Sequence, residues 1–245
     1  PMLELKREGG VARVFLDRPG KANALDSALL ERLAGTLEGL RADESLRAVV
    51  LGGRGNSFCG GADVGELERL DGASAREFIL RVHRACAAAR RLPVPVVARL
   101  HGAVIGAGLE LAAACDLRIA AHGTRFAMPE VRLGIPSVVE AALLPRLVGS
   151  GRAAWLVLTG EAIDAERACQ WGLVEAACAA DALDAAIERT VASLVAGDRE
   201  ALRAQKELLQ LWEETPLAGA VAASVERFAA ARKHTMPSVS DSEKH

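Results

Sequence analysis

Two glutamates in apolar surroundings are the side chains best suited to move protons. Glu110 follows a glycine cluster at 106–108, and Glu130 ends an apolar stretch that begins at 126. Burial in such surroundings raises a carboxyl pKa toward the range that general acid–base catalysis uses. Each also has a structural explanation. A helix dipole favours Glu110 in a first turn, and Arg125 or Arg132 could form an ion pair with Glu130.

Two glycine-rich loops are suited to present backbone N–H groups to a ligand. Residues 56–64 follow a predicted strand at 47–52, and residues 102–108 run into a predicted apolar helix at 111–115. Glycine lets the backbone approach a ligand closely, and a helix start leaves N–H groups free to polarise a carbonyl. Each loop, taken alone, is also compatible with an ordinary glycine turn.

The elements that carry these loops predict an α/β protein. Strands and helices alternate, which is typical of parallel strands joined by helical crossovers. The expected elements are a hairpin of strands 3–6 and 11–17, a helix from Asp26-Ser27 with Leu30, Leu33, Leu37 and Leu40 on one face, a strand at 47–52, a helix through Phe78, Val82 and Cys86, and a strand at 94–104.

The last third of the chain is predicted to be helical. Helical periodicity with few β-branched runs covers 151–159, 164–171, 181–196, 198–213 and 216–234. We expect residues 1–190 to form the core with the ligand site and residues 191–245 a helical C-terminal region with a frayed tail from Pro237.

Composition excludes several classes of function. The formal net charge of −2 gives no general attraction to nucleic acid or to an anionic membrane. No apolar run approaches the ~20 residues of a spanning helix, and the start lacks a secretory signal, so we expect a soluble cytoplasmic protein. The five cysteines are scattered, which predicts reduced thiols and no metal site.

Five motifs in order resemble the enoyl-CoA hydratase/isomerase (crotonase) superfamily over nearly the whole chain. Any one of them is weak, but their joint order and spacing are specific. They are the turn 18–26 (RPGKANALD), the loop 57–64 (SFCGGADV), the segment 106–110 (GAGLE), the segment 128–130 (MPE), and the stretch from Thr159-Gly160 through Gly172-Leu173-Val174.

This resemblance implies a crotonase-like spiral of repeated β-β-α units with a helical C-terminal oligomerisation region, as a homotrimer or a dimer of trimers. The implied ligand is an acyl-CoA thioester, handled in fatty acid metabolism without a separate cofactor. The amides of Ala62 and Ala107 would form the oxyanion hole, and Glu110 and Glu130 would be catalytic. The implied CoA and substrate contacts are Ala22, Ala24, Gly61, Ala62, Asp63, Val64, Gly106 and Ala107.

The presence of both glutamates resembles hydratases, which add water to a 2-enoyl-CoA to give a 3-hydroxyacyl-CoA. In that arrangement Glu130 would exchange a proton at C2, and Glu110 would orient the attacking water. The alternatives are a Δ3/Δ2 enoyl-CoA isomerase, in which Glu130 would dominate, and a non-catalytic acyl-CoA-binding subunit.

The stretch after Glu130 departs from the family pattern and is one residue shorter. Glu140 stands where a glycine is common, near the expected site. Ser137 and Glu140 have the spacing of a capping box, which predicts that Glu140 caps a helix. The alternative is a third acid that alters specificity. The family's usual closing pattern is also not recognisable before the C-terminus.

Overall fold

The computed structural model describes residues 2–235 and divides into two compact units. The first unit ends at Val195 and contains every candidate site residue. The second begins at Ala196 and is helical. The predicted tail from Pro237 lies outside the described residues.

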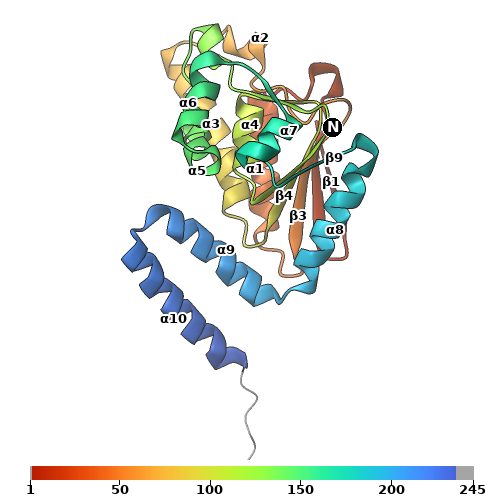
Figure 1. Ribbon diagram of the computed structural model, residues 1–245. Coiled ribbons are helices and arrows are strands. Elements are labelled where there is room, and N and C mark those ends of the chain that lie inside the picture. Colours follow the sequence, from red (N-terminus) through yellow and green to blue (C-terminus); the bar gives the residue numbers. More distant parts are fainter. Residues whose placement is uncertain (1, 236–245) are drawn as a thin grey trace, which may run out of the picture. The chain divides into compact units, whose positions relative to one another are not determined.

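A six-stranded sheet forms the frame of the first unit, in the order β1-β2-β3-β4-β6-β9. Strands β1 and β2 are the predicted hairpin and pair antiparallel, with Leu3 opposite Leu16. All later pairs are parallel. The strands are β1 Leu3–Glu8, β2 Val11–Leu16, β3 Ala48–Gly53, β4 Val96–Leu100, β6 Leu117–Ala121 and β9 Ala176–Cys178 (Figure 1).

The chain also forms a second sheet of three strands, which lie along the sequence between the later strands of the first sheet. This second sheet contains β5 Ala103–Ile105, β7 Arg125–Ala127 and β8 Ile163–Asp164. The prediction of one strand over 94–104 is therefore wrong, because the chain leaves β4 and turns at Gly102 before β5. Gly102 has φ +59°, and a Cβ there would lie 1.9 Å from the Asn56 carbonyl oxygen. Only glycine fits this crossing between sheets.

Helices complete repeated units in which a strand of each sheet is followed by a helix, as in β4-β5-α4. The predicted helix from Asp26 is α1, and the Asp26 side chain caps it by accepting the Leu29 N–H at 2.8 Å. The helix predicted at 111–115 begins earlier, at Ala107. The helices up to this point are α1 Ser27–Leu40, α2 Val64–Leu67, α3 Gly72–Arg90 and α4 Ala107–Ala113.

The sheet is buried on both faces, which explains its continuous apolar strands. In β3, Val49 and Leu51 pack into the larger core with α1, α3 and α4, whereas Val50 faces the opposite side. There it packs with Ile187 and Val191 of α8 in a smaller core. The predicted α/β class with repeated β-β-α units is confirmed.

The predicted helical texture after residue 150 is also confirmed. Three short 3-10 turns come before it, and strands β8 and β9 and a fourth 3-10 turn interrupt it. The 3-10 turns are η1 Pro19–Lys21, η2 Glu130–Leu133, η3 Val139–Leu143 and η4 Ala180–Ala182, and the helices are α5 Leu144–Val148, α6 Ser150–Thr159, α7 Ala165–Trp171, α8 Leu183–Ala196, α9 Arg199–Glu214 and α10 Leu217–Thr235. Over the described residues, no helix is both long and apolar enough to cross a membrane.

Candidate active site

The turn that carries Ala22 and Ala24 is bound to the first glycine loop by backbone hydrogen bonds. The Gly60 N–H donates to the Ala22 carbonyl at 2.8 Å, and the Leu25 N–H donates to the Gly61 carbonyl at 2.8 Å. The Asp63 N–H then donates to the Leu25 carbonyl at 2.9 Å. Two segments that are far apart in sequence therefore form one rigid wall, and it contains six of the predicted contact residues.

Asn23 is the buried centre of this wall, although sequence reasoning did not select it. It is fully buried, its Oδ1 accepts the Arg18 N–H at 2.8 Å, and its Nδ2 donates to the carbonyls of Arg54 and Ser57 at 2.9 and 2.8 Å. Its positive φ of 57° suits asparagine better than most residues. Asn23 belongs to the RPGKANALD motif, so the sequence did point to this turn, but the motif alone did not separate the supporting role of Asn23 from the roles of its neighbours.

We expect Asn23→Ala to lower the free energy of unfolding by about 2–3 kcal/mol, because several buried backbone groups lose their partner. Urea unfolding measures this directly. Asn56→Ala is the matched control, since the Asn56 side chain is exposed in the adjoining loop. A loss at Asn23 no larger than at Asn56 would contradict this role.

Asp63 fixes the other end of the loop through two cations. Its carboxylate is buried, and Oδ2 lies 3.1 Å from Arg18 Nη2 and 3.3 Å from Lys21 Nζ. Burial by itself would raise the pKa of Asp63, but the Lys21 and Arg18 contacts hold that pKa below its usual value. Asp63 also accepts the Glu66 N–H and so caps α2. Its role in this structure is to hold the loop.

The N–H groups of Ala62 and Ala107 lie on two loops that touch. Cys59 pairs with Val104 in a parallel bridge, and the Ile105 N–H donates to the Cys59 carbonyl at 3.0 Å. A Cβ on Gly61 would lie 2.9 Å from the Ile105 carbonyl oxygen and 3.8 Å from the Ala107 nitrogen. Within the described residues, neither the Ala62 N–H nor the Ala107 N–H has an acceptor. Two free amides on adjoining loops can polarise one carbonyl oxygen.

The Glu130 carboxylate lies against the second of these loops. A Cβ on Gly106 would lie 2.6 Å from Glu130 Oε1, so this oxygen covers the residue that precedes Ala107. Oε2 accepts the Ser137 hydroxyl at 2.9 Å. Within the described chain, Glu130 forms no ion pair, so the ion pair suggested by the neighbouring arginines is absent.

Glu110 is buried in the first turn of α4, with 4% of its surface exposed. Burial raises the pKa of Glu110 to about 8, and the negative charges of Glu130 and Glu140 add to this shift. Backbone N–H groups of Ala141 and Val138 act in the opposite direction. The site therefore brings Glu110 and Glu130 close enough to interact, and Glu110 holds its proton at neutral pH.

This burial predicts a pH-dependent stability penalty that Glu110→Gln should remove. The unfolded carboxyl has a pKa near 4.5 and the folded one about 8, so the folded chain binds more protons between these values and its stability falls as pH rises through them. Above the folded pKa, we expect the glutamine variant to be more stable than the parent by about 1–3 kcal/mol.

Denaturant unfolding at several pH values measures the difference. The gain should disappear below about pH 5, where both chains are neutral at this position. A constant difference across the range would contradict the raised pKa of Glu110.

One short segment contacts both glutamates. Ser137 donates to Glu130, and the backbone of Val138 and Ala141 lies near enough to Glu110 to lower the pKa of Glu110, while the Ala141 N–H donates to the Val138 carbonyl at 3.0 Å. The predicted capping box of Ser137 and Glu140 is wrong, because η3 has no side-chain cap. Glu140 instead contacts Nδ1 of His83 at 2.7 Å.

An apolar cavity of about 710 Å³ adjoins this segment. Its wall includes Val64, directly after Asp63, and Val138, directly before the strained Val139. Leu133, Ile135 and Pro136 belong to the stretch that is shortened relative to the family pattern, and they also line the cavity. The cavity suits an apolar chain, and its shape depends on the departing segment.

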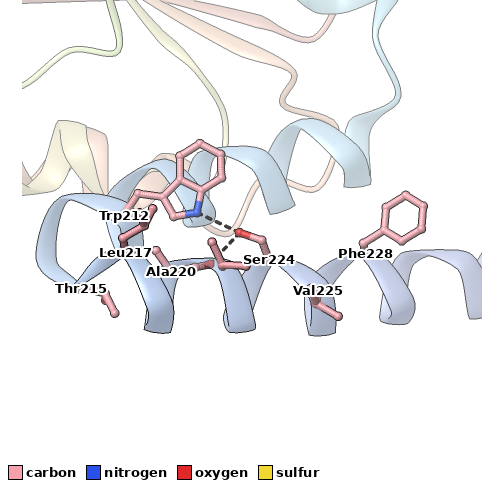
Figure 2. Close-up of a pocket in the computed structure, with 8 residues that line it drawn as sticks. Trp212, Thr215, Leu217, Ala220, Ser224, Val225 and Phe228 are labelled. Carbon is pink, nitrogen blue, oxygen red and sulfur yellow. Dashed lines mark hydrogen bonds between the residues drawn. The ribbon is translucent and has the colours of Figure 1, made fainter.

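A separate cavity of about 830 Å³ lies within the second unit, between α9 and α10 (Figure 2). The Trp212 Nε1–H donates to the Ser224 hydroxyl at 3.0 Å, and Ser224 in turn donates to the Ala220 carbonyl at 2.7 Å. Its described lining carries no acid, base or thiol. The described lining therefore offers no group for acid–base chemistry.

Comparison with known families agrees with the fold and the motifs. A family model described as enoyl-CoA hydratase/isomerase matches residues 6–238. The chain therefore belongs to the enoyl-CoA hydratase/isomerase family.

The relatives of this chain include proteins named as hydratases and a protein named as an isomerase. A solved structure of an enoyl-CoA hydratase from Mycobacterium smegmatis has a TM-score of 0.93 and 35% identity, covering 97% of this chain and 93% of that one. The 2,3-dehydroadipyl-CoA hydratase of Escherichia coli is 34% identical over 92% of this chain and 88% of its own. A trans-2-decenoyl-[acyl-carrier-protein] isomerase of Streptococcus mutans is 31% identical over 85% of this chain and 80% of its own.

Proposed function

We propose that this protein is an enzyme that reversibly hydrates a 2-enoyl-CoA thioester to a 3-hydroxyacyl-CoA. The observation that carries this proposal is that two interacting carboxyls, Glu110 and Glu130, lie at a pair of free backbone amides. Isomerisation needs one carboxyl to move one proton, whereas hydration needs a proton at one carbon and a water at the next. The second carboxyl therefore favours hydration.

In the proposed mechanism, the amides of Ala62 and Ala107 bind the thioester oxygen. They stabilise the negative charge that develops there as water adds to the conjugated bond, a contribution of ~2.7–4 kcal/mol per donor in comparable sites. The water oxygen, held by Glu110, forms its bond to C3 as the C2–C3 double bond breaks. Glu130 takes up the proton that this water loses and delivers a proton to C2, so Glu130 is unchanged over the whole reaction. One water is consumed, and no redox change occurs.

The surfaces beside the two amides suggest where the CoA portion and the acyl chain of the ligand bind. We propose that the CoA portion lies along the wall formed by Ala22, Ala24 and the 61–64 loop. The acyl chain then extends into the apolar cavity lined by Val64 and Ile135. In this proposal, the stretch after Glu130 that is shorter than in the family pattern determines which acyl chains fit.

The exposed apolar face of α10 supports a homotrimer or a dimer of trimers. Leu217, Val221, Val225 and Phe228 are 80%, 54%, 60% and 71% exposed, which is unusual for large apolar side chains on one helix. We propose that copies of the chain cover this face in the assembly.

The proposal is tested by supplying purified protein with crotonyl-CoA and, separately, with a 3-enoyl-CoA. A hydratase consumes the enoyl absorbance of the first and forms 3-hydroxybutyryl-CoA, identified by mass. Formation of a 2-enoyl-CoA from the second, without hydration of the first, would identify an isomerase instead. Tight binding of both without a product would identify a binding subunit.

A further inference from the structure

The segment 137–139 borders the candidate site and two cavities at once. The Ser137 hydroxyl donates to Glu130 Oε2 at 2.9 Å. Val138 lines both the apolar cavity of about 710 Å³ and a second cavity of about 400 Å³, and Val139 also lines the second one. A segment that borders open space on this scale has fewer neighbours to hold it than a segment of the core.

The backbone of this segment is strained. Val139 has φ +43°, which is an outlier for a β-branched side chain. Such a conformation persists only where the surrounding structure imposes it. The Ala141 N–H donates to the Val138 carbonyl at 3.0 Å, but this bond lies within the turn and does not attach it to another element. A contact from outside the turn is needed to hold it.

The side chain of Glu140 supplies such a contact. Glu140 follows Val139 in η3, its side chain is 7% exposed, and its Oε1 lies 2.7 Å from Nδ1 of His83 on α3. In the described chain its Oε2 is buried without a hydrogen-bond partner, which is costly. A glutamate that contributes to stability alone would not leave an oxygen in this state.

The hydrogen bond between His83 and Glu140 does not require a particular charge on Glu140. Burial raises the pKa of Glu140, whereas His83 and Arg90 act in the opposite direction. A charged Glu140 accepts the Nδ1–H of His83, and a protonated Glu140 donates to an unprotonated Nδ1. The two side chains therefore stay joined in either state.

We propose that the hydrogen bond between His83 and Glu140 fixes the strained segment 137–139 to α3 and so keeps the Ser137 hydroxyl on Glu130. His83 is then a positioning residue that acts on Glu130 through this segment. The consequence for catalysis rests on the proposed hydration, because Glu130 must be held in place to deliver a proton to C2.

The kinetic test is a double-mutant cycle of His83→Ala and Ser137→Ala. His83→Ala should lower kcat for crotonyl-CoA by about 3–10-fold, the range expected for one hydrogen bond. KM should stay within about twofold, because other loops form the proposed CoA wall. In the Ser137→Ala background, adding His83→Ala should lower kcat by less than about twofold, since the contact through which His83 acts is already lost.

Three variants are the controls. His122→Ala removes another half-exposed histidine that is paired with a glutamate, Glu166, and it should leave kcat within about twofold of the parent. His83→Asn places an amide near the position of Nδ1, and Glu140→Gln keeps an oxygen for Nδ1–H. Both should retain most of the parent kcat, which a role for the charge of Glu140 would not allow.

Hydrogen exchange in the full chain tests the same contact without substrate. In His83→Ala, the amides of 139–141 should exchange about 3–10-fold faster than in the parent, while the amides of α1 stay unchanged. Failure of the parent to hydrate crotonyl-CoA would refute the proposed function, and exchange alone would then decide the role of His83.

Unchanged exchange at 139–141 in folded His83→Ala would overturn the proposal, as would fully additive losses of kcat in the cycle with Ser137→Ala. His83 is 47% exposed, and alanine favours helices, so this variant is expected to fold. If it does not, His83→Phe carries the same comparisons, because it keeps a ring but has no nitrogen to contact Glu140.

Discussion

Glu130→Gln should reduce the turnover of crotonyl-CoA by about 10²–10⁴-fold while leaving acyl-CoA binding within a few-fold of the parent. The amide has nearly the same shape, and it can still accept the Ser137 hydroxyl, but it cannot give a proton to C2. Because Glu130 forms no ion pair in the described chain, the stability should change little. Steady-state rates and calorimetric binding of a 3-hydroxyacyl-CoA measure the two effects separately.

Glu161→Gln is the control for this variant, because it makes the same chemical change at an exposed position. Turnover of the Glu130 variant within about tenfold of the control would remove Glu130 from proton transfer. A parallel loss of binding and turnover would instead mean that Glu130 holds the loop rather than the proton.

Gly61→Ala should be the second large effect, with turnover falling by about 10²–10³-fold, the scale of losing one oxyanion donor. Gly61 has φ +99°, and an added Cβ would lie 2.9 Å from the Ile105 carbonyl oxygen. Since that neighbour is backbone, the two loops must separate, and the Ala62 and Ala107 amides can no longer converge on one oxygen. The measured quantity is kcat/KM for crotonyl-CoA.

Gly60→Ala provides the matched control one residue away. It has no positive φ, and its added Cβ would make only ordinary contacts of 3.4 Å with Ala22. We expect it to retain turnover within a few-fold. If the two variants lose activity equally, loop flexibility rather than amide geometry sets the rate.

Local patterns predicted the frame of this protein well. The leucine spacing of α1 and the apolar strands β2 and β3 reflect burial that each segment imposes on its own residues. The segment 94–104 has the apolar pattern of a single strand, and this pattern led to the wrong prediction. The bend at Gly102 depends on a close approach to Asn56, which is more than 40 residues earlier. Such a crossing leaves no periodic signal.

Motifs in the sequence selected the candidate site residues, but they did not select the residues that support them. Glu110, Glu130 and the two loops follow from motifs, whereas Asn23 and His83 act through contacts with residues 31 to 57 positions away. The capping box failed for the same reason. Ser137 and Glu140 have the spacing of a capping box, but in the fold Ser137 donates to Glu130 and Glu140 contacts His83.

The central claim is that water adds to C3 of an enoyl thioester bound at the Ala62 and Ala107 amides. The most direct test is to incubate the purified protein with crotonyl-CoA in heavy-oxygen water and to locate the label by mass spectrometry. The account predicts one labelled oxygen at C3 of 3-hydroxybutyryl-CoA, formed by the parent and nearly absent with Glu130→Gln. Crotonyl-CoA that remains unconverted by the folded parent, or a 3-hydroxybutyryl-CoA without the label at C3, would contradict it.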